Sequence, residues 1–165
     1  MIFPSEKFYT LFADSYNEYS SNKNKYISAV NKFIQEESSS PKSMVDVGSG
    51  DGKRSREIAN TLGIEKITLI DNSEGMIILA KRVYAAEINQ TDISNLSFEI
   101  KQNYDLVTFL WNVLGHISLD SREIALKNLS RLVSYSGVIF IDVNNRYNIS
   151  HYGIGSVLKN IFKDI

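Results

Sequence analysis

Three glycines alternate along a loop that follows a short β-branched run, and an aspartate ends the next apolar run. The glycines are Gly48, Gly50 and Gly52, and Asp71 lies about 20 residues further on. Glycine permits a tight turn and lets a ligand approach the backbone, while the helix that follows offers unpaired N–H groups. A carboxylate at the place of Asp71 can accept hydrogen bonds from both hydroxyls of a ribose. The pattern predicts a site for an adenosine-containing ligand, and the alternative is a purely structural turn.

The spacing of the loop distinguishes between ligand classes. A dinucleotide site favours a third glycine where this chain has Lys53. The segment 46–52 instead resembles motif I of the class I S-adenosylmethionine-dependent methyltransferases, and the segments 71–76, 91–93 and 104–112 resemble later motifs of that family in the same order. The resemblance, to the small-molecule type, implies a Rossmann-like three-layer α/β sandwich. It also implies S-adenosylmethionine as cofactor and S-adenosylhomocysteine as product.

The resemblance further implies which residues hold the cofactor. Motif I would hold the methionine end, and the end of the fourth strand would border the sulfonium. Asp71 would bind the ribose, and Asn72 and Met76 would contact the faces of the adenine. Asp92 would bind the adenine amino group, with Ile93 nearby. The implied cofactor-binding residues are Asp46, Gly48, Ser49, Gly50, Asp71, Asn72, Met76, Asp92, Ile93, Leu110 and Trp111.

Several of these residues also have a structural interpretation. Asp92 can cap a helix that begins at Ile93, and Trp111 can belong to the core. Tyr16 lies in the segment 12–17, which is similar to the N-terminal segment of small-molecule members, where a tyrosine closes the cofactor pocket. Packing on an apolar helix face explains this tyrosine equally well.

His116 is the candidate general base. It follows the fourth apolar run, and an imidazole titrates near neutral pH, so it can take a proton from an accepting hydroxyl or ammonium. The alternative is a structural histidine at a helix start. His151 lies too far along the chain for an H-x-x-x-H pair, so no metal site is expected. The segment 111–114 lacks the Asn/Asp-Pro-Pro-aromatic motif of base-methylating relatives. We therefore expect a small-molecule acceptor methylated at oxygen or nitrogen.

Strands that alternate with helices must position these residues. Apolar runs predict strands at 44–47, 67–71, 106–110 and 138–143, with a weaker one near Ile88. Continuous apolar strands separated by helices indicate a mostly parallel sheet that is covered on both faces. The resemblance implies the strand order 3-2-1-4-5.

Helical periodicity appears before the first strand. It predicts one helix opened by Ser5 as a cap and a second over 26–34. We expect these helices to form an N-terminal cap, residues 1–37, over the cofactor mouth. Asp120 and Glu123 are expected to open a later helix as a capping box.

Length, composition and charge bound the remaining function classes. A chain of 165 residues predicts a single domain, here a helical cap followed by a core over residues 43–165. The absence of cysteine excludes disulfides and thiolate metal sites and favours the cytoplasm. A net charge of -1 offers no basic field for nucleic acid, and no apolar run approaches the ~20 residues of a membrane helix.

The end of the sequence departs from the family pattern. Relatives usually add two strands after the fifth, whereas the segment 153–165 predicts a helix. We therefore expect an open edge on strand five, covered by a homodimer or a partner chain. This favours, as an alternative, a noncatalytic S-adenosylmethionine-binding module that acts with a partner. An NAD-dependent oxidoreductase is the third alternative, disfavoured by Lys53.

Overall fold

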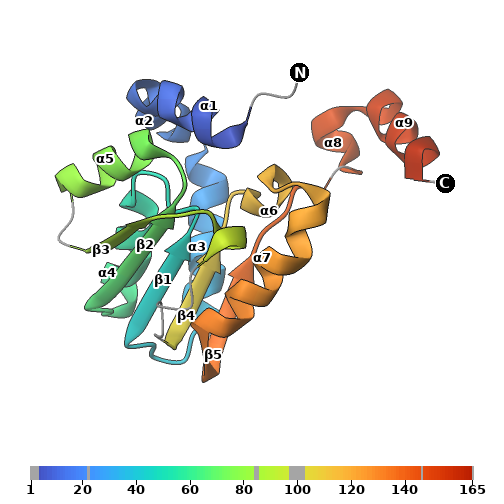
Figure 1. Cartoon of the computed structure of the whole chain (residues 1–165). Helices are drawn as coiled ribbons and strands as arrows, with labels where there is room; N and C mark the ends of the chain where they lie inside the picture. Colours follow the sequence, from blue (N-terminus) through green and yellow to red (C-terminus); the bar gives the residue numbers. More distant parts are fainter. Residues whose placement is uncertain (1–3, 22, 84–85, 97–102, 146, 165) are drawn as a thin grey trace.

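A parallel five-stranded sheet forms the centre of the molecule (Figure 1). The architecture comes from a computed structural model, which describes residues 4–21, 23–83, 86–96, 103–145 and 147–164. The strands are β1 (Ser43–Val47), β2 (Lys66–Asp71), β3 (Glu87–Gln90), β4 (Tyr104–Phe109) and β5 (Val133–Ile141). Their order is β3-β2-β1-β4-β5, and each neighbouring pair is parallel. The predicted α/β fold class and strand order are confirmed.

Helices precede, connect and follow the strands. The N-terminal ones are α1 (Ser5–Phe12), the 3-10 turn η1 (Ala13–Ser15), α2 (Tyr16–Ser21) and α3 (Asn24–Glu37). Those between strands are α4 (Lys53–Leu62), α5 (Glu74–Val83), the 3-10 turn η2 (Ile93–Asn95), α6 (Val113–His116) and α7 (Leu119–Leu132).

The two central strands carry apolar side chains on both faces, because successive residues of a strand point in opposite directions. On one face, Met44 of β1 and Leu106 of β4 pack with residues of α3 and α4. On the other face, Val45 and Val107 pack with residues of α7. All four strand side chains are fully buried. This burial explains why the two strands are mostly apolar in the sequence.

The N-terminal segment differs from its prediction. A 3-10 turn breaks the expected first helix after Phe12, and Pro4 occupies the cap position, so Ser5 is the first helical residue rather than a cap. Phe8 and Leu11 are 48% and 79% exposed. Helix α1 docks on α5 instead through the Thr10 backbone, next to Gly75, and Thr10 Oγ1 lies 3.0 Å from Ser73 Oγ just before α5.

The expected capping box before α7 is also wrong. Helix α7 begins at Leu119, so Asp120 and Glu123 already lie inside its first turns. Ser118 precedes the helix, and its hydroxyl lies 2.9 Å from the Ser121 hydroxyl rather than bonding to a backbone N–H.

Strand β5 begins earlier than predicted, directly after α7, so Gly137 lies inside it. Tyr104 pairs with Val133 and Leu106 pairs with Val138, which leaves an irregular stretch between these pairs. A Cβ atom on Gly137 would lie 2.7 Å from the Tyr104 carbonyl oxygen. Glycine is therefore required where the irregular strand approaches its neighbour.

Two further helices follow β5, and they extend away from the sheet (Figure 1). Helices α8 (Ile149–Tyr152) and α9 (Ile154–Asp164) pack mainly against each other. Helix α9 confirms the predicted final helix, whose last position, Ile165, lies outside the described residues. Over the described ranges, no helix is long and apolar enough to cross a membrane, and no group of three or more His, Asp or Glu side chains could hold a metal ion.

Candidate functional site

The glycine loop leaves the carboxyl end of β1 and turns sharply into α4. Gly48, Gly50 and Gly52 all have positive φ, at 73°, 56° and 75°. The N–H of Gly48 donates to the Ile70 carbonyl over 2.7 Å, which ties the loop to β2. A Cβ atom on Gly48 would lie 2.5 Å from a Val113 methyl group. Both the backbone angle and the space therefore require glycine at this turn.

Asp71 is the last residue of β2, and its carboxylate holds the glycine loop in place. Its carboxylate accepts the Gly50 N–H over 2.9 Å and the Ser73 N–H over 2.8 Å. Burial raises the pKa of Asp71, while these two hydrogen bonds oppose the rise. The side chain predicted to bind ribose thus already has a structural role, and its two oxygens are fixed beside the loop.

Asp46 lies on β1 beneath the same loop. One oxygen accepts the Ser55 hydroxyl of α4 over 2.5 Å, and the other accepts the Thr108 hydroxyl of β4 over 2.6 Å. Burial raises the pKa of this carboxyl, and the two hydroxyls lower it. Asp46 therefore joins three elements at the base of the site.

A cavity of about 370 Å³ opens above the carboxyl ends of β1, β2 and β4. In an open α/β sheet this is where ligands bind, beside the point at which strand order reverses. Eleven of the thirteen predicted site residues line it: Tyr16, Asp46, Gly48, Ser49, Gly50, Asp71, Asn72, Met76, Leu110, Trp111 and His116.

Asp92 and Ile93 do not line the cavity. The Asp92 carboxylate caps η2 by accepting the Ser94 N–H over 2.8 Å, so the capping interpretation is confirmed. It also accepts the Asn72 side-chain amide over 3.1 Å, which places it behind a lining residue. Burial would raise the pKa of Asp92, but the hydrogen bonds from Ser94 and Asn72 lower it below its ordinary value. Ile93 is buried in the core.

The N-terminal helices form one wall of the cavity, to which α1, α2 and α3 contribute Tyr9, Tyr16, Ser20, Asn24 and Ile27. The Tyr16 hydroxyl lies over Gly50, 3.0 Å from where a Cβ atom would be, and its ring centre is 6.0 Å from that of Trp111. Burial and then the charge of Asp51 raise the pKa of Tyr16, so its hydroxyl stays protonated at neutral pH. The expected N-terminal helices are present, and they contribute these residues to the lining of the cavity.

His116 faces the same cavity from the last residue of α6, not from a helix start as the alternative supposed. Its Nε2 lies 3.5 Å from the Tyr9 hydroxyl. Burial lowers the pKa of this imidazole below its ordinary 6.5. The neutral form, which can accept a proton, therefore dominates at physiological pH.

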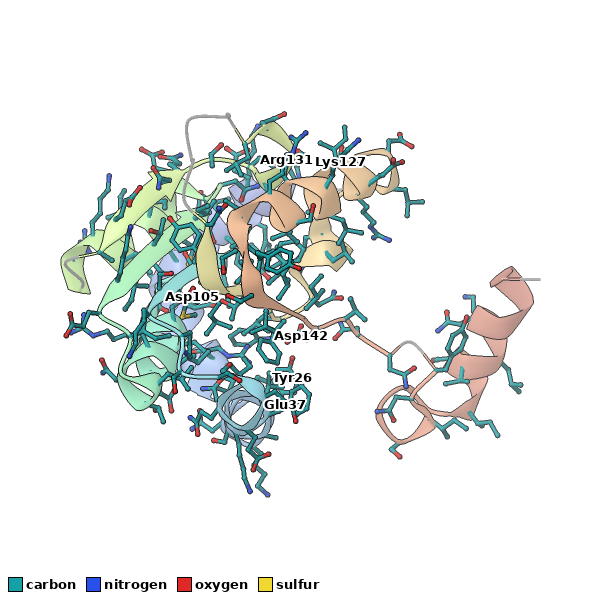
Figure 2. All side chains as sticks on the ribbon, turned by 90° about the horizontal axis from the view of Figure 1, so that it is seen from below. Tyr26, Glu37, Asp105, Lys127, Arg131 and Asp142 are labelled. Carbon is teal, nitrogen blue, oxygen red and sulfur yellow. The ribbon has the colours of Figure 1, made fainter. Side chains whose placement is uncertain are left out.

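The turn after β4 is strained and is held by residues that the sequence did not single out. Trp111 and Asn112 have φ of 65° and 58°, a left-handed pair without glycine. Asp142, just after β5, accepts the Asn112 N–H over 2.7 Å and the Tyr26 hydroxyl of α3. Figure 2 shows Tyr26 and Asp142 directed toward each other. An acidic residue at a strand end, the signal that identified Asp71, could have identified Asp142.

The comparisons with known proteins agree with this geometry. A family model described as a methyltransferase domain matches residues 44–137. No curated protein matches the sequence. Among solved structures, the DhpI complex with SAH has a TM-score of 0.69 at 21% identity over 81% of this chain. The plantazolicin methyltransferase BpumL, solved with a triazolic desmethylPZN analogue and SAH, has a TM-score of 0.64 at 25% identity over 93%.

A third structure is the sugar N-methyltransferase KedS8 from Streptoalloteichus sp ATCC 53650, with a TM-score of 0.63 at 18% identity over 78% of this chain. The match spans 64% of DhpI, 64% of BpumL and 53% of KedS8, which is less than two thirds of each.

Proposed function

Because this chain belongs to the methyltransferase domain family, we propose that it transfers a methyl group from S-adenosylmethionine to an oxygen or nitrogen of a small-molecule acceptor. The observation that carries the proposal is the cavity above the glycine loop. Asp71, Asn72 and Met76 line the part that would hold the adenosine, and Leu110 and Trp111 line the part that would hold the sulfonium. An adenosine and a methionine chain need such neighbouring polar and apolar surfaces.

The proposed placement of the cofactor follows the lining residues. Its methionine end lies on the loop of Gly48, Ser49 and Gly50, and the free lone pairs of Asp71 accept the ribose hydroxyls. Asn72 and Met76 contact the adenine. Asp92 orients the Asn72 amide toward the adenine through their hydrogen bond, from behind the cavity wall, and Ile93 packs in the core next to it.

The cofactor supplies a methyl group that is already activated on a sulfonium, so the protein mainly aligns the acceptor and excludes water. Tyr16 and Trp111 enclose the reacting region between the N-terminal helices and β4. His116 accepts the proton that the acceptor loses as its new bond to carbon forms. Its lowered pKa leaves the imidazole able to do so at neutral pH.

The acceptor class is inferred from charge and from related proteins. The net charge of -1 and the lack of the base-methylating motif favour a small molecule over nucleic acid. The similar structures include a sugar N-methyltransferase and a plantazolicin methyltransferase, which supports an acceptor other than nucleic acid. The segment 1–37 acts as the helical cap and 43–165 as the cofactor-binding core of one domain.

Ligand-dependent melting tests the proposal directly. At 100 times its dissociation constant, a ligand selective for the native state stabilises by ~2.7 kcal/mol, so S-adenosylhomocysteine should raise the melting temperature. NADH is the control, and a larger shift with NADH would overturn the assignment. A screen of hydroxyl- and amine-bearing acceptors, with S-adenosylhomocysteine quantified as product, then tests turnover.

A second candidate is a noncatalytic S-adenosylmethionine-binding module that acts with a partner chain. It is favoured by β5, which is an edge strand of the described sheet. It is also favoured by the similarity to the putative methyltransferase solved in complex with the Haloferax volcanii Trm112 methyltransferase activator, which has a TM-score of 0.69 at 19% identity and covers 87% of this chain and 64% of that one. Tight binding of S-adenosylhomocysteine without turnover of any acceptor would support this candidate.

A further inference from the structure

Asp142 lies just outside the cavity, yet it is bonded to the turn that leads into it. Its own N–H donates to the Phe109 carbonyl over 3.3 Å, which continues the pairing of β5 with β4 by one residue. From this anchored position its carboxylate accepts the Asn112 N–H over 2.7 Å. The Asn112 side-chain oxygen in turn accepts the Asn144 N–H over 3.1 Å. The turn after β4 and the segment after β5 are thus bonded in both directions.

The bond from Asn112 to Asp142 holds a costly backbone conformation. Trp111 and Asn112 lie in the left-handed region, which asparagine tolerates but a bulky tryptophan does not. Such residues persist only where the surrounding structure holds them, and they cluster at functional sites. Trp111 lines the cavity, so the residue under strain is one whose place matters to a ligand.

The same turn determines where α6 lies. Asn112 directly precedes α6, and the Gly115 N–H donates to the Asn112 carbonyl over 2.9 Å. A Cβ atom on Gly115 would collide with the Asn112 side-chain amide, so the helix packs closely against this residue. Helix α6 places Val113 against Gly48 of the glycine loop and ends at His116. The position of His116 therefore depends on the position of Asn112.

The second oxygen of Asp142 connects this turn to the N-terminal helices. It accepts the Tyr26 hydroxyl of α3 (Figure 2). Partial burial and the hydrogen bond to Asp142 raise the pKa of Tyr26, an effect that Arg54 partly opposes, so the hydroxyl keeps its proton and donates it. Ile27, the next residue of α3, lines the cavity. One carboxylate therefore joins α3, the turn after β4 and the end of β5.

We propose that Asp142 is a positioning residue of the methyl transfer, which fixes the turn after β4 through Asn112 and so places α6 with His116 facing the acceptor. The inference rests on the proposed function, in which His116 accepts the proton of the acceptor. Asp142 acts as a hydrogen-bond acceptor and touches no ligand. An asparagine keeps one acceptor oxygen for the Asn112 N–H, whereas an alanine keeps none.

Nuclear magnetic resonance of the histidine rings follows α6 without any cofactor or acceptor. His116 is one of two histidines in the sequence, so selective labelling leaves two sets of ring signals, and His116→Asn assigns them. The His116 ring centre lies 5.7 Å from that of Tyr9, at an angle of 82° between the ring planes. The ring current of Tyr9 shifts the His116 signals away from those of a solvated histidine. These signals therefore report the place of His116 beside α1.

The variants to compare are Asp142→Ala, the conservative Asp142→Asn, and Tyr26→Phe, which removes only the bond from α3. Asp105→Ala is the matched control. Asp105 also accepts backbone N–H groups from another segment, those of Lys42 over 2.8 Å and Ser43 over 3.1 Å, but it does so at the opposite end of β4 and does not line the cavity.

Asp142→Ala should move the His116 signals most of the way to those of a solvated histidine, while Asp142→Asn and Asp105→Ala should keep the wild-type signals. Tyr26→Phe should move them in the same direction by a smaller amount, and it decides the question if Asp142→Ala does not fold. Wild-type signals in folded Asp142→Ala, or in Tyr26→Phe if the alanine variant unfolds, overturn the inference. Equal displacement in Asp142→Asn and Asp142→Ala, or in Asp105→Ala and Asp142→Ala, also overturns it.

Turnover with an acceptor found by the screen completes the test. Asp142→Ala should lower kcat by about 10- to 100-fold, because a misplaced general base loses much of its contribution, and Asp142→Asn should restore kcat to within about 3-fold of the wild type. Wild-type kcat in Asp142→Ala overturns the inference. Failure of the wild-type protein to bind S-adenosylhomocysteine or to methylate any acceptor would instead overturn the proposed function, and the ring signals would still show whether Asp142 places α6.

Discussion

Two buried aspartates at the ends of neighbouring strands show how a single residue can serve both the fold and the site. Asp46 has both oxygens occupied by hydroxyl groups of Ser55 and Thr108. Asp71 accepts backbone N–H groups instead, from Gly50, Ser73 and Asn72. Each carboxylate therefore ties separate segments together at the base of the site and still has acceptor capacity for a ligand.

Replacing Asp71 with asparagine should weaken both ligand binding and folding. An amide offers one acceptor oxygen where two N–H groups, from Gly50 and Ser73, need one each. We expect a loss of about 1.5–3 kcal/mol in S-adenosylhomocysteine affinity and of about 1–3 kcal/mol in unfolding free energy. Calorimetry and urea denaturation measure the two quantities. Unchanged affinity in a destabilised protein would show that the ribose binds elsewhere.

The lowered pKa of His116 predicts two pH dependences. If the imidazole is the general base, turnover should rise with pH through an apparent pKa below the ordinary 6.5, and His116→Asn should remove the rise. At pH values between the lowered pKa of folded His116 and the ordinary 6.5 of the unfolded chain, His116 binds more protons in the unfolded chain than in the folded one. The free energy of unfolding should therefore fall as the pH falls through that window. His116→Asn should also flatten this part of the stability curve. A rise in turnover that survives in the variant would assign the ionisation to another group.

At the scale of elements, the strands could be predicted because their pattern is local. Strands β1 and β4 are buried on both faces, so their sequences are mostly apolar, and the glycine loop follows β1 without a gap. The break at Phe12 could not be predicted, since Phe8 and Leu11 keep helical periodicity although they are exposed. The start of β5 was missed because Gly137 resembled a strand boundary, whereas it serves a close approach inside the strand.

In the candidate site, too, the residues that belong to a local sequence pattern could be predicted, and those that tertiary packing brings in could not. Gly48 and Asp71 belong to the chain segments that define the loop and the strand end, so sequence spacing locates them. Tyr9 and Ile27 reach the cavity only through the packing of α1 and α3, which spacing along the chain does not determine. The Tyr26–Asp142 contact joins residues that are far apart in the sequence, so spacing along the chain could not predict it either.

The docking of α1 on α5 depends on one close approach. A Cβ atom on Gly75 would lie 2.8 Å from the Thr10 carbonyl oxygen, so Gly75→Ala should push α1 away and speed hydrogen exchange in residues 5–12. Gly155→Ala is the matched control, since a Cβ atom on that helical glycine would have nothing within 4 Å. The control should leave α1 unchanged and slightly stabilise α9. Equal exchange of α1 in both variants would contradict the packing argument.

At the scale of the whole molecule, the two ends of the chain contribute differently. The N-terminal helices line the cavity, whereas α8 and α9 pack mainly against each other. Deleting residues 1–21 should therefore weaken S-adenosylhomocysteine binding at least about 10-fold, or 1.4 kcal/mol. Deleting residues 147–165 should leave the affinity unchanged and the melting temperature within about 2 °C. Calorimetry and thermal denaturation of both variants test this contrast, and a loss of affinity in the second would place the tail at the site.

The docking of α1 on α5 also fixes an order of events during synthesis. Residues 5–21 leave the ribosome before the surface that receives them, which begins at Ser73 and Gly75. Until then Phe8 and Leu11, which stay exposed even in the finished fold, belong to a nascent segment with nothing to pack against. A segment that is made before its docking surface must wait for that surface, so the cavity wall that it forms can close only after β2 and α5 have been synthesised.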